Sequence, residues 1–165
     1  MAYRRVYVFA DWEGLPEGIL MGQLQSELIR GKEVFSFHYS PEWLSTNFAQ
    51  MLDPDLVFSE GLQYLSDNKT NFGLFLDSSP DRWGRVLLRR REVALARLEK
   101  RVPQNLRELD FLLGVFDGNR MGGLRFKKEI DLNEEEQEFM DLSIPEFDKT
   151  IAGKILDEIF EDLLL

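Results

Sequence analysis

The side chains that catalysis most often uses are scarce in this sequence. His38 is the single histidine of the 165 residues, and no cysteine is present. Thiol catalysis, disulfide scaffolds and cysteine-based zinc sites are therefore excluded, and a zinc site built on two histidines is excluded as well. His38 lies beside aromatic residues in a predicted strand, where we expect a structural role.

Two pairs of aspartates have a spacing that could hold a divalent ion. Asp53 and Asp55 flank a proline, while Asp77 and Asp81 flank a predicted helix start. Turn and capping roles account for all four carboxylates without a metal. We therefore expect neither a metal ion nor a cofactor.

Residues 114–123 form a glycine-rich connection that could cradle a phosphate through its backbone amides, with Arg120 and Arg125 nearby. The connection lacks the Gly-Lys-Ser/Thr ending of a nucleotide P-loop and does not follow the dinucleotide-binding fingerprint. The alternative is a tight turn from a helix into a strand, in which glycine supplies positive φ angles. We favour the turn.

A basic helix is predicted over residues 80–101, which hold eight basic and three acidic residues. These cations could meet phosphates, RNA or an acidic protein face. The alternatives are a solvated face and pairing with the acidic end of the chain. Trp83, Leu87, Ala94 and Leu98 recur on one side of this helix, and we expect Trp83, Leu87 and Leu98 to be buried.

The net charge of −10 is concentrated at one end of the chain. Residues 129–165 hold 13 acidic and 2 basic residues, whereas residues 1–128 are close to neutral. A near-neutral body makes only a weak long-range field, so global charge favours neither nucleic acid nor a membrane surface. The apolar stretch after Arg5 is too short for a signal sequence or a membrane span, and we expect a cytoplasmic protein.

The first sixty residues carry the pattern of a small antiparallel sheet. Residues 4–10, 18–25 and 32–39 are rich in β-branched and aromatic side chains and are separated by glycine-containing turns. Alternation places Phe35, Phe37 and Tyr39 on one face of the third strand. Ser40 and Pro41 then open a helix, and a further strand is expected at residues 55–58.

Beyond the basic helix, we expect a helix over residues 104–115 that buries Leu106, Leu109 and Leu113, and then a strand over residues 124–128. An exposed acidic linker is expected at residues 129–142. A helix over residues 143–165 follows, because Ser143 and Glu146 match a capping box and an apolar residue recurs at every fourth position from Phe147 to Leu163. This apolar stripe should fold back on the domain or dock on a partner.

These elements predict an α+β fold, with a small bent antiparallel sheet followed by a helical half and a C-terminal amphipathic helix. We expect one domain over residues 1–128, with its β-rich part at about 1–60 and its helical part at about 72–128.

Three runs of residues are distinctive enough to compare with a known protein family. They are 37–44, Phe-His-Tyr-Ser-Pro-Glu-Trp-Leu; 72–85, which contains Pro-Asp-Arg-Trp-Gly-Arg; and 120–126, Arg-Met-Gly-Gly-Leu-Arg-Phe. In this order they resemble the N-terminal region of HipA-like serine/threonine kinases, the toxins of a bacterial toxin–antitoxin module. The resemblance covers residues 5–128. It departs at Gly123, where the family usually has alanine, and we expect this difference to cost little. The interaction candidates that the resemblance implies are Pro41, Glu42, Trp43, Asp77, Pro80, Asp81, Arg82, Trp83, Gly84, Arg85, Arg120, Met121, Gly122 and Gly123.

The groups with which that family transfers phosphate do not occur in these 165 residues. Phosphoryl transfer needs a nucleotide-binding loop, a catalytic loop and a metal-binding aspartate, and no catalytic residue can be carried over. The resemblance therefore implies a non-catalytic regulatory or substrate-recognition domain. Its partner would be a HipA-like kinase core, from the same operon or the rest of a longer chain, with an antitoxin and a second copy of this chain as further partners. The alternative is a free-standing module that binds phosphate or nucleic acid through helix 80–101.

Overall fold

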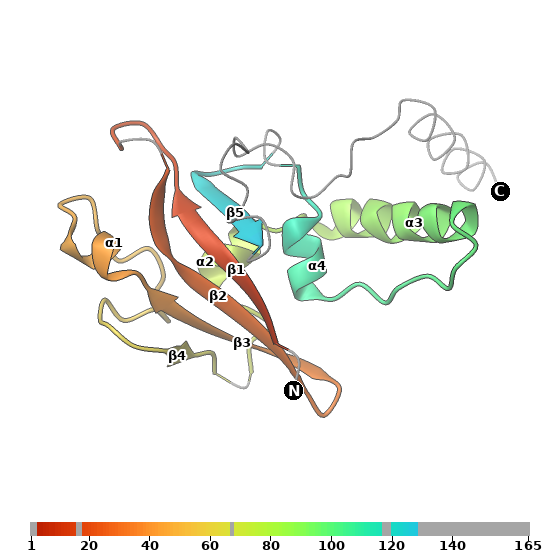
Figure 1. The fold of residues 1–165 in the computed structure, drawn as a ribbon, viewed down its shortest axis with the longest axis horizontal. Helices are drawn as coiled ribbons and strands as arrows, with labels where there is room; N and C mark the ends of the chain where they lie inside the picture. Colours follow the sequence, from red (N-terminus) through yellow and green to blue (C-terminus); the bar gives the residue numbers. More distant parts are fainter. Residues whose placement is uncertain (1–2, 16–17, 67, 117–119, 129–165) are drawn as a thin grey trace.

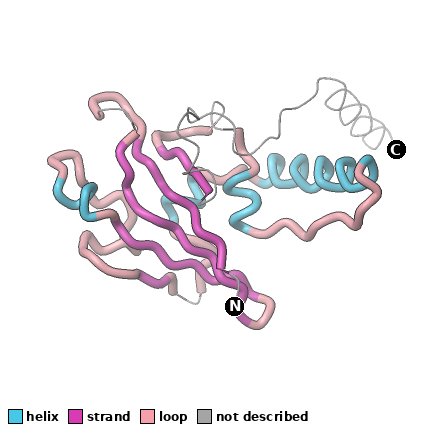
Figure 2. Tube along the Cα trace, viewed as in Figure 1, coloured by secondary structure: helices cyan, strands magenta, loops and turns pink. Residues whose placement is uncertain are grey.

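The computed structural model describes residues 3–15, 18–66, 68–116 and 120–128. Their centre is a five-stranded antiparallel sheet with the strand order β4-β3-β2-β1-β5. Its strands are β1 (Tyr3–Ala10), β2 (Ile19–Ile29), β3 (Lys32–Tyr39), β4 (Gln63–Tyr64) and β5 (Leu124–Lys128) (Figures 1 and 2). The predicted α+β class is confirmed, as are the three N-terminal strands and the strand at 124–128. The acidic linker predicted at 129–142 and the helix predicted at 143–165 lie outside the described residues.

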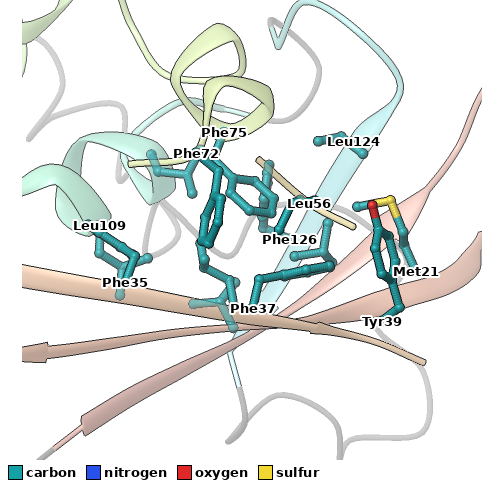
Figure 3. Close-up of a cluster of buried hydrophobic side chains, with 14 of the residues drawn as sticks. Met21, Phe35, Phe37, Tyr39, Leu56, Phe72, Phe75, Leu109, Leu124 and Phe126 are labelled. Carbon is teal, nitrogen blue, oxygen red and sulfur yellow. The ribbon is translucent and has the colours of Figure 1, made fainter. Parts of the chain in front are cut away.

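One face of the sheet carries the hydrophobic core, because alternate residues of each strand point to the same side. Phe35, Phe37 and Tyr39 of β3 are all buried, as their alternation predicts. Two short helices, α2 (Gly73–Asp77) and α4 (Glu108–Leu113), cover this face. Phe75 of α2 is the central side chain, with ring centroids 5.4 Å from Phe37 and 6.2 Å from Phe126 (Figure 3).

The prediction of a strand at residues 55–58 is wrong. Asp53 begins a turn there, in which its Oδ1 accepts a hydrogen bond from the Asp55 amide at 2.8 Å and its carbonyl accepts from the Leu56 amide at 3.1 Å. The side chain of Gln63 then bonds both the amide and the carbonyl of Val57, at 2.6 and 2.8 Å. Hydrogen bonds from local side chains therefore replace the backbone bonds that a strand would make here, and the edge strand of the sheet lies further along the chain, as β4.

The long helix α3 (Arg82–Leu98) lies within the predicted 80–101, but the burial expected of Trp83 and Leu98 is wrong, whereas Leu87 is half-buried and Ala94 in the same row is buried. The exposed fractions of Trp83 and Leu98 are 55% and 41%. Helix α3 extends away from the sheet and packs instead on the 99–114 segment (Figure 1). Leu88 and Leu95 lie on this packed side, where they border a small pocket of about 170 Å³ together with Leu113 and Gly114.

Helix α4 (Glu108–Leu113) is shorter than the predicted 104–115, because the backbone amides before it bond to carboxylate side chains rather than within a helix. The Gln104 amide donates to Glu92 of α3 at 2.7 Å, and the Arg107 amide donates to Asp110 at 2.9 Å. Leu109 and Leu113 are buried as predicted, whereas Leu106 is half-buried.

Candidate recognition surface

The first run with a family resemblance is anchored by Trp43. Helix α1 (Pro41–Ser45) begins as predicted, with Ser40 as N-cap, whose Oγ accepts a hydrogen bond from the Trp43 amide at 3.0 Å and donates one to the Leu20 carbonyl at 2.6 Å. This fixes Trp43 in the core, with no exposed surface, while Pro41 and Glu42 remain exposed.

Trp12 links this run to the third one. Its ring meets Trp43 edge to face, with centroids 5.8 Å apart. A Cβ atom placed on Gly123 would lie 2.7 Å from the Trp12 ring and 3.0 Å from the Asp11 carbonyl oxygen. Alanine, the residue usual in the family at this position, would therefore require the Trp12 ring to move.

The second run forms the joint between α2 and α3. Asp81 caps α3 by accepting a hydrogen bond from the Gly84 amide at 2.8 Å. Arg85 makes a two-pronged ion pair with Glu108, at 2.6 and 2.8 Å, which ties α3 to the start of α4. This hydrogen-bonded pair raises the pKa of Arg85. Arg82 and Trp83 are exposed.

Arg120 connects the second run to the third. Its guanidinium donates hydrogen bonds of 2.9 Å to the carbonyl oxygens of Ser78, Leu112 and Val115, and it lies over the Phe126 ring at 4.6 Å. The side chain is buried, so this cation is held by backbone dipoles in the interior.

The phosphate cradle considered for residues 114–123 receives no support from the described part of that connection. Arg120 is directed into the protein, and Arg125 donates to the Gly122 and Leu124 carbonyls and lies 3.4 Å from Asp11. Gly122 has a φ of +87°, as a tight turn into β5 requires.

Residues of the second and third runs border an open pocket of about 500 Å³, and Trp43 of the first run packs behind its Trp12 wall. Its walls come from the Trp12 loop, the loop that follows α1, helix α2 and the turn into β5, and they are mostly apolar. The lining includes Trp12, Leu52, Leu74, Asp77, Met121 and Gly123. Met121 stands at its rim with 84% of its surface exposed. Asp77 is exposed and is the one charged side chain among the described residues of the lining.

The predicted turn and capping roles of the aspartates are confirmed at Asp53 and Asp81. The buried Asp53 carboxylate serves two segments, because its second oxygen accepts a hydrogen bond from the Leu74 amide at 2.7 Å. Asp55 forms an ion pair with Lys69. No group of three or more metal-ligating side chains occurs within the described ranges.

His38 is part of β3, where burial, with a smaller contribution from the nearby Arg5 charge, lowers its pKa. Tyr39 beside it is more strongly perturbed. Burial, followed by the charge of Asp53, raises the pKa of Tyr39 to about 12.

Sequence reasoning singled out residues of all three runs but missed Trp12 and Asp53 as the side chains that join distant segments. A tryptophan directly after the last residue of an alternating strand was the available signal for Trp12. Comparison of the chain with family models, curated proteins and solved structures finds no match in any of the three. None of the helices that the structure describes has the length and apolarity needed to cross a membrane.

Proposed function

We propose that this chain is a non-catalytic regulatory or substrate-recognition domain of a HipA-like serine/threonine kinase toxin system. It acts in the cytoplasm by binding a kinase core through the pocket around Met121. The partner is a separate subunit or the remainder of a longer chain.

The observation that carries this proposal is the convergence of the second and third runs on one pocket. Leu74, Asp77 and Ser78 of the second run and residues 121–124 of the third line it directly, while Trp43 of the first run packs behind the Trp12 ring. An open, apolar pocket is what a recognition surface requires, because such pockets accept anchoring side chains of a partner.

The exposed apolar rim supports protein contact rather than chemistry. Met121 is a flexible side chain that adapts to irregular partner surfaces. Asp77 adds a carboxylate that would favour a lysine or arginine beside an apolar anchor. A nucleotide site would need cations for its phosphates, and none occurs among the described residues that line this pocket.

The test is calorimetric titration of the purified chain with the kinase core encoded by a neighbouring reading frame. Met121→Asp places a charge at the rim and should weaken binding at least tenfold, which corresponds to about 1.4 kcal/mol. Val102→Asp is the matched control, because Val102 is equally exposed, at 84%, and does not border the pocket.

Equal affinities for the two variants would remove the pocket from the proposal. No binding by the unchanged chain would contradict the kinase partnership itself. Titration with magnesium–ATP is a separate check, and micromolar binding would contradict a non-catalytic role.

A further inference from the structure

The outer side of α3 has the form of a helix-packing seam. Trp83, Val86, Arg90, Val93 and Arg97 recur at alternating spacings of three and four, which places them in one row along the helix. The opposite side is occupied, because it carries Arg85 with its partner Glu108 and Leu88 packed on Gly114. We call this row the outer seam.

The outer seam is apolar and cationic at once. The exposed fractions of Trp83 and Val93 are 55% and 36%. The Nη1 atom of Arg90 is shielded from solvent, and no hydrogen-bond partner for it occurs among the described residues. Arg82 extends the positive charge at the start of the seam, and α3 as a whole holds six arginines against one glutamate.

A row of this kind fits an acidic amphipathic helix better than it fits nucleic acid. Valines interleaved with arginines need apolar partner groups as well as negative ones, and Trp83 is the one seam side chain with an aromatic ring on which a base could stack. Tryptophan and arginine are also the residues that most often dominate protein interfaces.

This chain contains a segment of that chemistry. Residues 143–165 repeat an apolar residue every fourth position, through Phe147, Ile151, Ile155, Ile159 and Leu163, and hold six acidic and two basic residues. An apolar stripe flanked by carboxylates is complementary to the outer seam in both respects.

The point at which the described fold ends brings this segment within reach. Lys128, the last described residue, borders the same small pocket as Leu88, Arg91 and Leu95 of α3. Residues 129–142 can span up to roughly 46 Å, whereas the 17 residues of α3 are about 25 Å long. A short tether of this kind gives an effective concentration in the millimolar range, which favours contact within one molecule.

We infer that residues 143–165 dock as an amphipathic helix on the outer seam of α3 in the same molecule. The segment thereby occupies a surface suited to any acidic helix of a partner protein. This inference does not depend on the kinase partnership, because it concerns a different surface and only residues of this chain.

The experiment is ¹⁹F NMR of the full chain labelled with 5-fluorotryptophan. Its three tryptophans report on separate places, since Trp83 lies on the seam while Trp43 is in the core and Trp12 packs against it. Ile155→Asp should shift the Trp83 resonance and increase its solvent isotope effect, without moving the Trp12 and Trp43 resonances. Arg90→Glu should do the same from the other side of the contact.

Arg30→Asn is the matched control for loss of charge. Arg30 lies in the turn between β2 and β3 with a φ of +50°, a conformation that asparagine tolerates. This variant should leave all three resonances in place.

Shifts of the Trp12 and Trp43 resonances would show that Ile155→Asp disturbs the core. The Trp83 resonance of Ile155→Glu would then be compared with that of the unchanged chain, each at the urea concentration that gives the same folded fraction. A Trp83 resonance that neither variant moves, in a folded protein, would overturn the inference. A wild-type Trp83 position that changes on dilution, together with a dimer mass in light scattering, would assign the contact to a second copy and overturn docking within one molecule. A large shift of Trp83 on addition of an oligouridylate to the unchanged chain would show an open face suited to nucleic acid, which also contradicts it.

Discussion

Arg120→Ala should be among the most destabilising substitutions in this chain. The guanidinium reaches three carbonyl oxygens, one just after α2 and two at the end of α4, each at 2.9 Å, and only 7% of the residue is exposed. A hydrogen bond from a charged donor contributes about 1.5–3 kcal/mol, and part of this is recovered when water enters the vacated space. We therefore expect a loss of about 3–5 kcal/mol from the free energy of unfolding.

The assay is urea denaturation followed by circular dichroism, with the slope of the transition checked for constancy. In a chain of this size the expected loss corresponds to a fall in Tm of about 10 °C. Arg120→Lys keeps the charge but cannot bond three divergent carbonyls, so it should lose roughly half as much.

Arg125→Ala is the control, because Arg125 lies on the adjoining strand and makes its contacts at the surface, where the cost should stay below about 1 kcal/mol. If Arg120→Ala cost no more than Arg125→Ala, the carbonyl bonds of Arg120 would be irrelevant to stability and the link between the second and third runs would lose its physical basis.

Three further predictions follow from the site. Gly123→Ala should cost about 1–3 kcal/mol by displacing Trp12, visible as a lower urea midpoint; an unchanged midpoint would show that the ring moves freely. Because the folded-state pKa of His38 is lowered from 6.5, the unfolded chain binds more protons below that pH, so the contribution of His38 to stability is complete above about pH 6.5 and falls as the pH drops. His38→Gln should flatten the pH dependence of the urea midpoint in this range. An unaltered slope would assign that pH dependence to other groups. Asp53→Ala removes the acceptor for two backbone amides and should cost about 1–2 kcal/mol in thermal melts, whereas magnesium should leave the wild-type Tm unchanged; a rise in Tm with magnesium would contradict the purely structural role.

The sheet was predictable because its signals are local. Alternation in β3 decides which side chains face the core, and Ser40 followed by Pro41 announces the start of α1 without reference to the rest of the chain. The turn at 53–56 was mistaken for a strand because its apolar residues resemble one, while the side chains that prevent a strand, Asp53 and Gln63, lie on either side of it.

The packing side of α3 could not be obtained from periodicity. Two apolar rows run along this helix, one through Trp83 and Leu87 and the other through Leu88 and Leu95, and both have helical spacing. The choice between them depends on α4 and on the Arg85–Glu108 pair, which are set by tertiary structure.

The candidate site was predictable only in part, because Asp77, Met121 and residues 122–123 were candidates whereas Trp12, Gln50 and Leu52 were not. Nothing in the spacing of Ser78 and Arg120 indicates that a side chain of one bonds the carbonyl of the other across 42 positions. Such contacts depend on loops whose course is set by the packed core.

The position of β5 has a consequence for synthesis on the ribosome. β1 is an inner strand, but one neighbour, β2, ends at residue 29 while the other, β5, begins only at residue 124. At roughly 5–20 residues per second, the chain needs on the order of 5–20 s to elongate from the end of β3 to the end of β5. During that interval the backbone groups along one side of β1 have no strand to pair with, and an unpaired edge of this kind is a template for association between nascent chains. The last strand to emerge thus closes the part of the sheet that was made first.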